Sequence, residues 1–317
     1  NGYMSHVAFV EGAALAPTVF GETDSTSGIW KFKSPSGVTF GTNGFHLKFE
    51  NSAALGTDSS GNTNTFTVNG NLKQALDTPS NVHATFNALT RWRGQNRTPS
   101  QVLANGNLKT GIGSSEMALL TSTIGVKKGK WYWEAKSDGV SKMFFGICNS
   151  RAFGETNAPH DHSDAATSTG IYYYEAIPDF RYYSGATSTT GIASISSGDV
   201  LGFAMDCDNS VFWIHKNGVY MNSGVPTSGD TGTGAINRMF NYAGSLFYTN
   251  GVKDEMFASC YVSSTSGSGT ASFNFGNGYF GTTAITSAGS NGNGSLFEYD
   301  VPSGYYALNT KNINTYG

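Results

Sequence analysis

A pair of carboxylates in this sequence could carry out glycoside hydrolysis. Glu134 could act with Asp206 or Asp208, because glycosidases place two carboxyl groups on either side of a substrate groove. Asp206 and Asp208 also flank a short polar turn, where carboxylates commonly accept hydrogen bonds from the backbone. The sequence holds no Gly-x-Ser-x-Gly motif and no Gly-rich phosphate-binding loop. We therefore predict that these carboxylates are structural and that the protein is not an enzyme.

Two segments offer ligands for a metal ion. Residues 160–164 read His-Asp-His-Ser-Asp, and side chains at alternate strand positions could converge on one ion. Residues 58–64 offer several oxygen ligands for Ca²⁺, but they lack the carboxylates and spacing of an EF-hand loop. A solvated loop in the first segment and an Asx turn at Asp58 explain both without a metal. We predict no metal and no other cofactor.

Aromatic side chains are concentrated between residues 171 and 183, and strand alternation should divide them between two faces. Either Tyr173 or both of its neighbours are expected to face solvent. Exposed tyrosines are rigid and amphipathic, so they suit both stacking against a sugar ring and contact with another protein. A layer covered by loops or by a neighbouring subunit is the alternative. The candidate binding residues are Tyr172, Tyr173, Tyr174, Tyr182, Tyr183, His160 and His162.

The composition indicates many short strands joined by polar turns. Hydrophobic residues make up 38% of the 317 residues and charged residues 13%, and 41 Gly accompany 21 Phe, 16 Tyr and 5 Trp. So many aromatic residues supply the buried area that folding requires, which argues against disorder. The net charge of −3 creates no field that would attract nucleic acid, and the basic run Arg91-Trp92-Arg93 with Arg97 is expected to be a solvated strand. Since no apolar run is long enough to span a bilayer, we predict neither a nucleic-acid partner nor membrane insertion.

Three cysteines, Cys148, Cys207 and Cys260, lie in strand-like surroundings. An odd count without Cys-x-x-Cys spacing predicts small buried hydrophobic residues instead of a disulfide framework or a zinc site. Cysteine usage therefore leaves the redox compartment open.

Strand patterns recur along the chain, and helical periodicity is nearly absent. In residues 130–136, Trp131, Trp133 and Ala135 share one face, while Tyr132, Glu134 and Lys136 share the other. The pattern therefore predicts that Trp133→Ala costs about 3–5 kcal/mol, as a large core truncation does, and that Tyr132→Ala costs much less.

Local turn chemistry predicts a hairpin in residues 199–220. Two apolar runs surround the turn 206–210, and the second run leads into Asn217-Gly218, whose two positions require positive φ in a tight hairpin. Alternation also predicts short strands at 65–68 and 295–301, the second being the last of the chain.

Three segments resemble a SPRY domain, and the resemblance extends over residues 105–310. Gly129-Lys-Trp-Tyr-Trp-Glu134 is similar to one framework strand of that family, residues 199–218 to its central hairpin, and Phe273-Asn-Phe-Gly276 to its closing strand. Glu255-Met-Phe-Ala-Ser259 departs from the family, which usually has a proline after the aromatic residue. The resemblance implies an antiparallel β-sandwich of the concanavalin-like jelly-roll type. It also implies that partners bind the loops at one end, here 151–169 and 184–196.

The first 70 residues resemble parts of laminin-G or concanavalin-like sandwiches, on the segments Tyr3–Gly12 and Phe45–Phe49. We predict a β-rich N-terminal region at 1–85 and a SPRY-like sandwich at 86–317. The combination resembles fibre and particle-surface proteins of marine bacteriophages. We also expect the chain, which begins at Asn1, to be a segment of a longer polypeptide.

The resemblance implies a non-enzymatic structural or receptor-binding protein of the virion, such as an adhesin of a tail fibre, located on the virion or outside the cell. Its expected partners are a host cell-surface glycan or protein, other virion subunits, and copies of itself in a homo-oligomer. The alternatives are an intracellular SPRY adaptor that binds peptides and a glycan-degrading enzyme.

Overall fold

The computed structural model describes residues 4–25, 28, 30–70, 72, 74, 76–78, 81–89, 92–93, 102–112, 117–137, 143–153, 170–174, 179–182, 186–188, 193–238, 248–249, 252–263 and 269–317. The chain divides into two units, residues 2–82 and residues 83–317. The described residues contain no helix long and apolar enough to cross a membrane.

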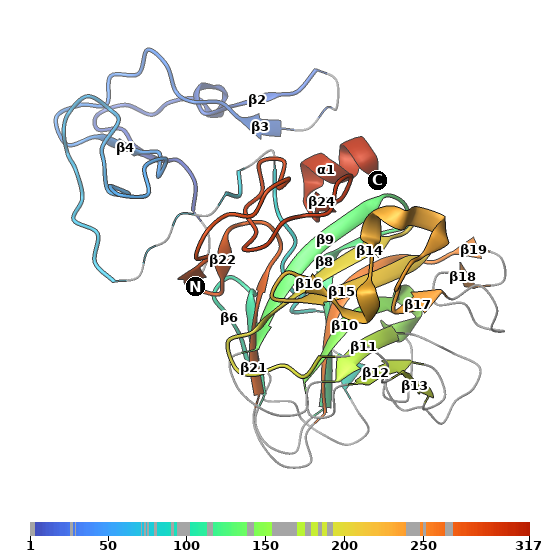
Figure 1. The fold of residues 1–317 in the computed structure, drawn as a ribbon. Coiled ribbons are helices and arrows are strands. Elements are labelled where there is room, and N and C mark those ends of the chain that lie inside the picture. The colour runs from blue at the N-terminus through green and yellow to red at the C-terminus, as the bar shows by residue number, and fades with distance from the viewer. Residues whose placement is uncertain are drawn as a thin grey trace. The chain divides into compact units, whose positions relative to one another are not determined.

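The larger unit consists mainly of two antiparallel sheets (Figure 1). The first sheet has the strand order β13 (Ala186–Ser188), β12 (Asp179–Tyr182), β11 (Gly170–Tyr174), β10 (Met143–Asn149), β20 (Met256–Ser263), β8 (Met117–Val126) and β5 (Trp92–Arg93). The second has the order β16 (Val219–Tyr220), β15 (Val211–Lys216), β14 (Val200–Asp206), β9 (Lys130–Ser137), β21 (Gly269–Asn274), β7 (Lys109–Ile112) and β6 (Val102–Ala104). In addition, β17 (Asn237–Arg238) pairs with β15, and β24 (Tyr306–Ala307) runs parallel to β9.

Short elements complete the larger unit. They are η2 (Ser150–Phe153), η3 (Met221–Ser223), η4 (Pro226–Thr231), the pair β18 (Tyr248–Thr249) and β19 (Val252–Lys253), the pair β22 (Tyr279–Phe280) and β23 (Thr283–Ala284), and the helix α1 (Thr310–Tyr316). No pattern in the sequence predicts α1. Asn309 caps this helix by accepting a hydrogen bond from the Asn312 backbone N–H at 2.8 Å.

The main core lies between the two sheets. Trp131 and Trp133 of β9 pack there with Phe145 of β10 and Phe203 of β14, and all four are fully buried. The rings of Trp133 and Phe203 stack with centroids 5.3 Å apart. Cys148, Cys207 and Cys260 are buried and are not in disulfides, as their surroundings predicted. The prediction of an all-β antiparallel β-sandwich is confirmed.

The outer face of the second sheet is also covered, which the sequence patterns did not predict. Tyr132 of β9 is as fully buried as Trp133 and packs with Trp213 and with Phe297, which comes from the C-terminal stretch. We call residues 287–308, which supply this covering layer, the cover segment. The face assignment of residues 130–136 is correct, but the expected exposure of Tyr132 is wrong because the cover segment buries it.

The predicted hairpin is confirmed. β14 pairs with β15 around the turn after Asp206, and β15 pairs with β16 through Asn217 and Gly218, whose φ angles are 48° and 85°. Both positive φ values are those that a tight two-residue turn requires. The turn therefore forms for the local reason that the sequence indicated.

Two predicted strands are absent from the structure. Residues 65–68 are irregular, and residues 295–301 form a single bridge, between Leu296 and Asn277. In the second segment, the N–H groups of Glu298 and Tyr299 donate to the Glu134 side chain. A side-chain acceptor thus replaces the backbone partner that a strand would need.

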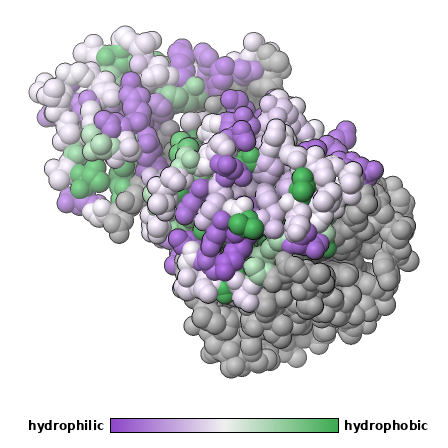
Figure 2. Space-filling model, in the orientation of Figure 1, coloured by the Kyte–Doolittle hydropathy of each residue, from purple (hydrophilic) through white to green (hydrophobic). Residues whose placement is uncertain are grey.

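The smaller unit contains two short strand pairs. β1 (Val7–Phe9) pairs with β4 (Phe45–Leu47), β2 (Gly21–Thr23) pairs with β3 (Trp30–Phe32), and the short helix η1 (Pro17–Val19) precedes β2. Long connecting segments occupy most of the rest. On the face drawn in Figure 2, the described surface is mainly hydrophilic or neutral, with small separate hydrophobic patches.

Candidate binding cleft and the polar network beneath it

The structure places one of the candidate tyrosines in the core. Tyr173 on β11 is fully buried, and its hydroxyl donates to the Ala193 carbonyl at 2.8 Å. Tyr173 is therefore no surface contact residue, contrary to its place among the candidates. Tyr172, Tyr174 and Tyr182 lie on β11 and β12, but their side chains are outside the described part of the chain. Tyr183, His160 and His162 lie outside the described residues altogether.

The carboxylates considered for hydrolysis occupy separate structural positions. On the ladder between β9 and β14, Glu134 pairs with Gly202 and Asp206 with Lys130. Along β14, four residues of strand, or about 13 Å, separate the backbone positions level with Glu134 and Asp206. Asp206 is fully buried, forms an ion pair with Lys130 at 3.1 Å and accepts the Asn209 backbone N–H at 3.0 Å. These contacts organise the turn between β14 and β15.

Asp58 also has a structural role. Its carboxylate accepts hydrogen bonds from the backbone N–H groups of His46, Ser60 and Asn64 at 2.8–2.9 Å. Burial raises the pKa of Asp58, but these hydrogen bonds outweigh it and lower the pKa to about 2. The Asx-turn interpretation is therefore confirmed. The described residues contain no group of three or more His, Cys, Asp and Glu side chains that could hold a metal ion.

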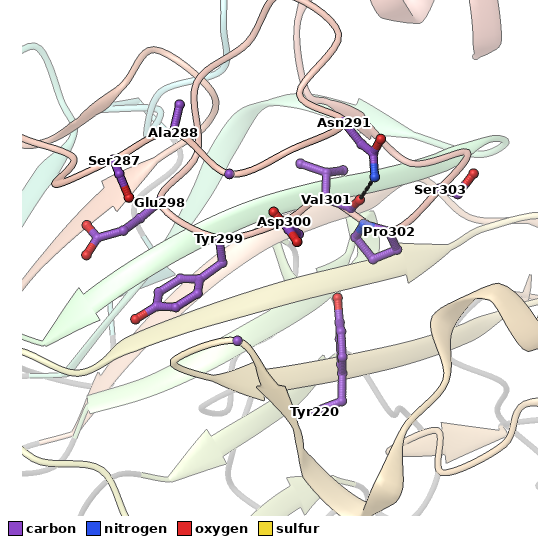
Figure 3. Close-up of a pocket in the computed structure, with 12 residues that line it drawn as sticks. Tyr220, Ser287, Ala288, Asn291, Glu298, Tyr299, Asp300, Val301, Pro302 and Ser303 are labelled. Carbon is purple, nitrogen blue, oxygen red and sulfur yellow. Dashed lines mark hydrogen bonds between the residues drawn. The ribbon is translucent and has the colours of Figure 1, made fainter.

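A cleft of about 500 Å³ opens between the β15–β16 turn and the cover segment (Figure 3). Its lining includes two tyrosines, two carboxylates, an amide and two serine hydroxyls. The lining residues are Gly218, Tyr220, Ser287, Ala288, Gly289, Asn291, Glu298, Tyr299, Asp300, Val301, Pro302 and Ser303. This volume lies in the range of pockets that hold small organic molecules.

Tyr220 and Tyr299 are the aromatic residues of the cleft. Figure 3 shows Tyr220 rising from β16 with its hydroxyl directed at the loop that carries Asp300 and Pro302. That hydroxyl oxygen is buried and has no hydrogen-bond partner among the described residues. A buried hydroxyl without a partner costs about 1–3 kcal/mol.

The carboxylates give the cleft a negative character. Asp300 accepts a hydrogen bond from the Ser290 backbone N–H at 2.7 Å, and the hydrogen bonds from Ser290 lower its pKa, so it is ionised at neutral pH. Glu298 lies two residues earlier in the same segment. None of the lining residues, all of them described, is basic.

A buried carboxyl group lies directly beneath this cleft. Glu134 is 0% exposed, and its oxygens accept four hydrogen bonds from described residues. Oε1 accepts the Tyr299 backbone N–H at 2.8 Å and the Tyr132 hydroxyl at 3.1 Å. Oε2 accepts the Glu298 backbone N–H at 2.9 Å and the Asn274 side-chain amide at 3.3 Å. Asn274, from the Asn-Phe-Gly motif, also donates to the Leu296 carbonyl at 2.9 Å, so it helps to hold the cover segment.

The network continues through His215 on β15. His215 Nδ1 accepts the Gly218 backbone N–H at 3.1 Å, and Nε2 lies 2.7 Å from the Tyr132 hydroxyl. Because Nδ1 is an acceptor in the neutral ring, the proton lies on Nε2 and is donated to the Tyr132 oxygen. The His215 ring also contacts the rings of Tyr220 and Tyr299, with centroids 5.1 and 5.4 Å away.

Burial controls the ionisation of this network. It raises the pKa of Glu134 to about 7, although the hydrogen bonds from Glu298, Tyr299, Tyr132 and Asn274 act in the opposite direction. Burial also lowers the pKa of His215 to about 3, so the imidazole is neutral under ordinary conditions. The pKa of the Tyr299 hydroxyl is raised, first by burial and then by the charges of Glu298, Glu134 and Asp199.

Sequence reasoning missed the cleft because its two walls are far apart in the chain. Gly218 and Tyr220 follow the predicted hairpin, whereas the opposite wall comes from residues 287–303. The signal available in the sequence was Phe297-Glu-Tyr-Asp300, an aromatic residue between two carboxylates, next to a Gly-, Ser- and Asn-rich stretch.

No family model matches the chain, and no curated protein matches it. Among solved structures, the chain is similar to the SPRY domain of human HERC1, with 14% sequence identity and a TM-score of 0.39, covering 59% of this chain and 96% of that one. These comparisons do not test the resemblance to bacteriophage structural proteins, which stays a prediction.

Proposed function

We propose that the protein is a non-enzymatic binding module whose cleft holds a sugar residue of a glycan. The observation that carries this proposal is the lining itself, in which Tyr220 and Tyr299 lie beside carboxylate, amide and hydroxyl groups in about 500 Å³. A sugar presents apolar C–H faces to aromatic rings and hydroxyl groups to hydrogen-bond acceptors, so one ligand satisfies both kinds of group.

The charge of the cleft restricts which sugars fit. Asp300 and Glu298 are carboxylates, and no lining residue is basic. Like charges placed together weaken binding, so acidic sugars are disfavoured. The expected ligands are neutral sugars and sugars that carry an amine.

The position of the carboxylates supports binding without hydrolysis. Glu298 and Asp300 come from one short segment and so from one wall of the cleft. Glycosidases need two carboxyl groups on opposite sides of the scissile bond. Glu134, the nearest further carboxyl group in the network, is fully buried beneath the cover segment.

The biological setting that we propose is the surface of a virion, outside the cell, with a host cell-surface glycan as the partner. It is supported by the resemblance of the sequence to fibre and particle-surface proteins of bacteriophages. In that setting the rigid sandwich would hold the cleft in place for contact with the host.

Isothermal titration calorimetry with a panel of neutral, amine-bearing and acidic saccharides tests the proposal. We expect at least one neutral or amine-bearing saccharide to bind, and we expect Tyr299→Ala to weaken that binding about tenfold or more. Tyr316→Ala is the matched control, because Tyr316 is 43% exposed and is not a cleft residue.

Equal affinities for wild type and Tyr299→Ala, or binding of acidic saccharides alone, would overturn the assignment. Chromatography of the saccharides after prolonged incubation should show no shorter products, and their appearance would contradict a non-enzymatic module.

A further inference from the structure

The polar network beneath the cleft ends on the cleft's own walls. At one end, the Gly218 backbone N–H donates to His215. At the other end, the backbone N–H groups of Glu298 and Tyr299 donate to Glu134. Since Gly218, Glu298 and Tyr299 all line the cleft, the network connects both walls through side chains that no ligand needs to touch.

With Glu134 ionised, every hydrogen in the network has an acceptor. The Gly218 N–H is taken by His215 Nδ1, the His215 Nε2–H by the Tyr132 oxygen, and the Tyr132 hydroxyl hydrogen by Glu134 Oε1. The carboxylate has enough lone pairs for its four donors. This arrangement therefore holds both walls in place.

A proton added to Glu134 has no position that keeps every hydrogen bond of the network. On Oε2 it would face two donors, the Glu298 N–H and the Asn274 amide. On Oε1 it could be donated to the Tyr132 oxygen, but the Tyr132 hydrogen would then need His215 Nε2 as its acceptor. The His215 proton would have to move to Nδ1, where it would face the Gly218 N–H. Each arrangement therefore loses at least one hydrogen bond of the network. In each, a backbone N–H group of a cleft wall points at another hydrogen instead of at an acceptor.

The other ionisable groups around Glu134 do not neutralise it. The elements packed against Glu134 present titratable or charged groups to it. The exception is β21, which presents the uncharged Asn274. These groups are Tyr132, Lys136 and the Lys130–Asp206 ion pair from β9 and β14, His215 from β15, Tyr220 from β16, and Glu298 and Tyr299 from the cover segment. The Lys136 ammonium lies over the Phe280 ring, 5.7 Å from its centroid. Among the described ion pairs, Glu134 has no cationic partner.

We propose that Glu134, Tyr132 and His215 are positioning residues of the cleft, and that protonation of Glu134 displaces the backbone of its walls and so weakens ligand binding in acid. The consequence for ligands rests on the proposed function, whereas the displacement of the walls does not. Because burial raises the pKa of Glu134 to about 7, the change falls near neutral pH.

Amide NMR spectroscopy of the ligand-free full chain tests the displacement. We expect the amide signals of Gly218, Glu298 and Tyr299 to shift with a shared midpoint near pH 7. In Glu134→Gln these three signals should not titrate between about pH 5.5 and 8.5, because an amide neither gains nor loses a proton there. Unshared midpoints, or the same titration in Glu134→Gln, would overturn the proposal.

Tyr132→Phe provides a second test that keeps the aromatic ring. It removes one hydrogen bond from the carboxylate, so the shared midpoint should move to higher pH. Glu298→Gln, which changes a cleft carboxylate but keeps the backbone N–H, is the control and should keep the midpoint of wild type. A midpoint that moves in Glu298→Gln and not in Tyr132→Phe would contradict a role for Glu134.

Calorimetry with the tightest saccharide of the panel completes the test. Binding to wild type should weaken about tenfold between pH 8.5 and 5.5, which corresponds to one weakened hydrogen bond, while Glu134→Gln should bind weakly at both values. An affinity independent of pH in wild type would refute the effect on ligands. If no saccharide binds, the proposed function fails, and the amide titration still decides whether Glu134 controls the walls.

Discussion

Tyr132 and Trp133 lie side by side on β9 and point to opposite faces, yet both are 0% exposed. Tyr132→Ala should therefore destabilise the protein by about 3–5 kcal/mol, close to the cost of Trp133→Ala. Truncation of Tyr132 also removes one of the four hydrogen bonds to Glu134 and the contact of its hydroxyl with His215 Nε2. Urea denaturation measures both losses.

The exposed Tyr316 serves as the control for these substitutions. Tyr316 stacks on Tyr306 with ring centroids 3.7 Å apart, so Tyr316→Ala should cost about 0.5–1.5 kcal/mol, well below the loss expected for Tyr132→Ala. If Tyr132→Ala were as mild as this control, the cover segment would not bury Tyr132 in solution.

Glu134 should make the stability of the protein depend on pH. Its folded pKa of about 7 lies above the ordinary value of 4.5, so between these values the folded state binds more protons than the unfolded state. The contribution of Glu134 to stability is therefore full below pH 4.5 and is lost as the pH rises through 7. The loss amounts to about 3 kcal/mol by pH 8.

Urea denaturation at pH 5.5 and pH 8 compares wild type with Glu134→Gln. The stability of wild type relative to the variant should fall as the pH rises. A difference that stays constant, or grows with pH, would show that Glu134 is not a buried group with a raised pKa.

At the scale of elements, Gly202 allows β14 to pass beneath the His215 ring. Gly202 pairs with Glu134 on one side and with His215 on the other. A Cβ atom at this position would lie 1.9 Å from His215 Nε2. Gly202→Ala should therefore displace the imidazole and cost about 1–3 kcal/mol, as overpacking of a core does.

Gly111→Ala is the matched control for Gly202→Ala. Gly111 is also a strand glycine, but the nearest atom to its Cβ would be a Thr270 side-chain methyl at 3.1 Å, which can shift slightly. Thermal unfolding should show a clearly larger loss for Gly202→Ala. Equal losses would mean that His215 is not held against Gly202.

The elements that were predicted correctly are those with local causes. The Asn217-Gly218 turn follows from two adjacent residues that tolerate positive φ. The conformation of residues 295–301 depends instead on Glu134, which lies more than 160 residues earlier in the chain. Its carboxylate accepts hydrogen bonds from the N–H groups that a neighbouring strand would otherwise have paired. Alternation identifies the two faces of such a segment, but it cannot say what lies against either one.

At the scale of the whole molecule, the division into two units predicts separate unfolding of residues 2–82 and 83–317. Asp58→Asn removes a carboxylate that accepts three backbone hydrogen bonds in the smaller unit. Differential scanning calorimetry should show that the unfolding transition of residues 2–82 loses about 1–2 kcal/mol of stability. The unfolding transition of the sandwich should not change. A single transition that shifts as a whole would contradict the division.

The sequence predicts which kinds of side chain form the candidate site, but not which residues they are. Aromatic and polar residues suited to sugars were expected from the composition, but the tyrosines chosen were those with the greatest density in the sequence, and Tyr173 among them is buried. The cleft brings Tyr220 together with Tyr299, which is 79 positions away in the chain. Only the fold brings these residues to one place.

A crystal structure of the protein with the tightest neutral saccharide shows where the ligand binds. We expect a sugar ring against Tyr299, with hydroxyl groups within hydrogen-bond distance of Asp300. A saccharide bound instead at the tyrosine-rich segment 171–183, with the cleft unchanged, would contradict it.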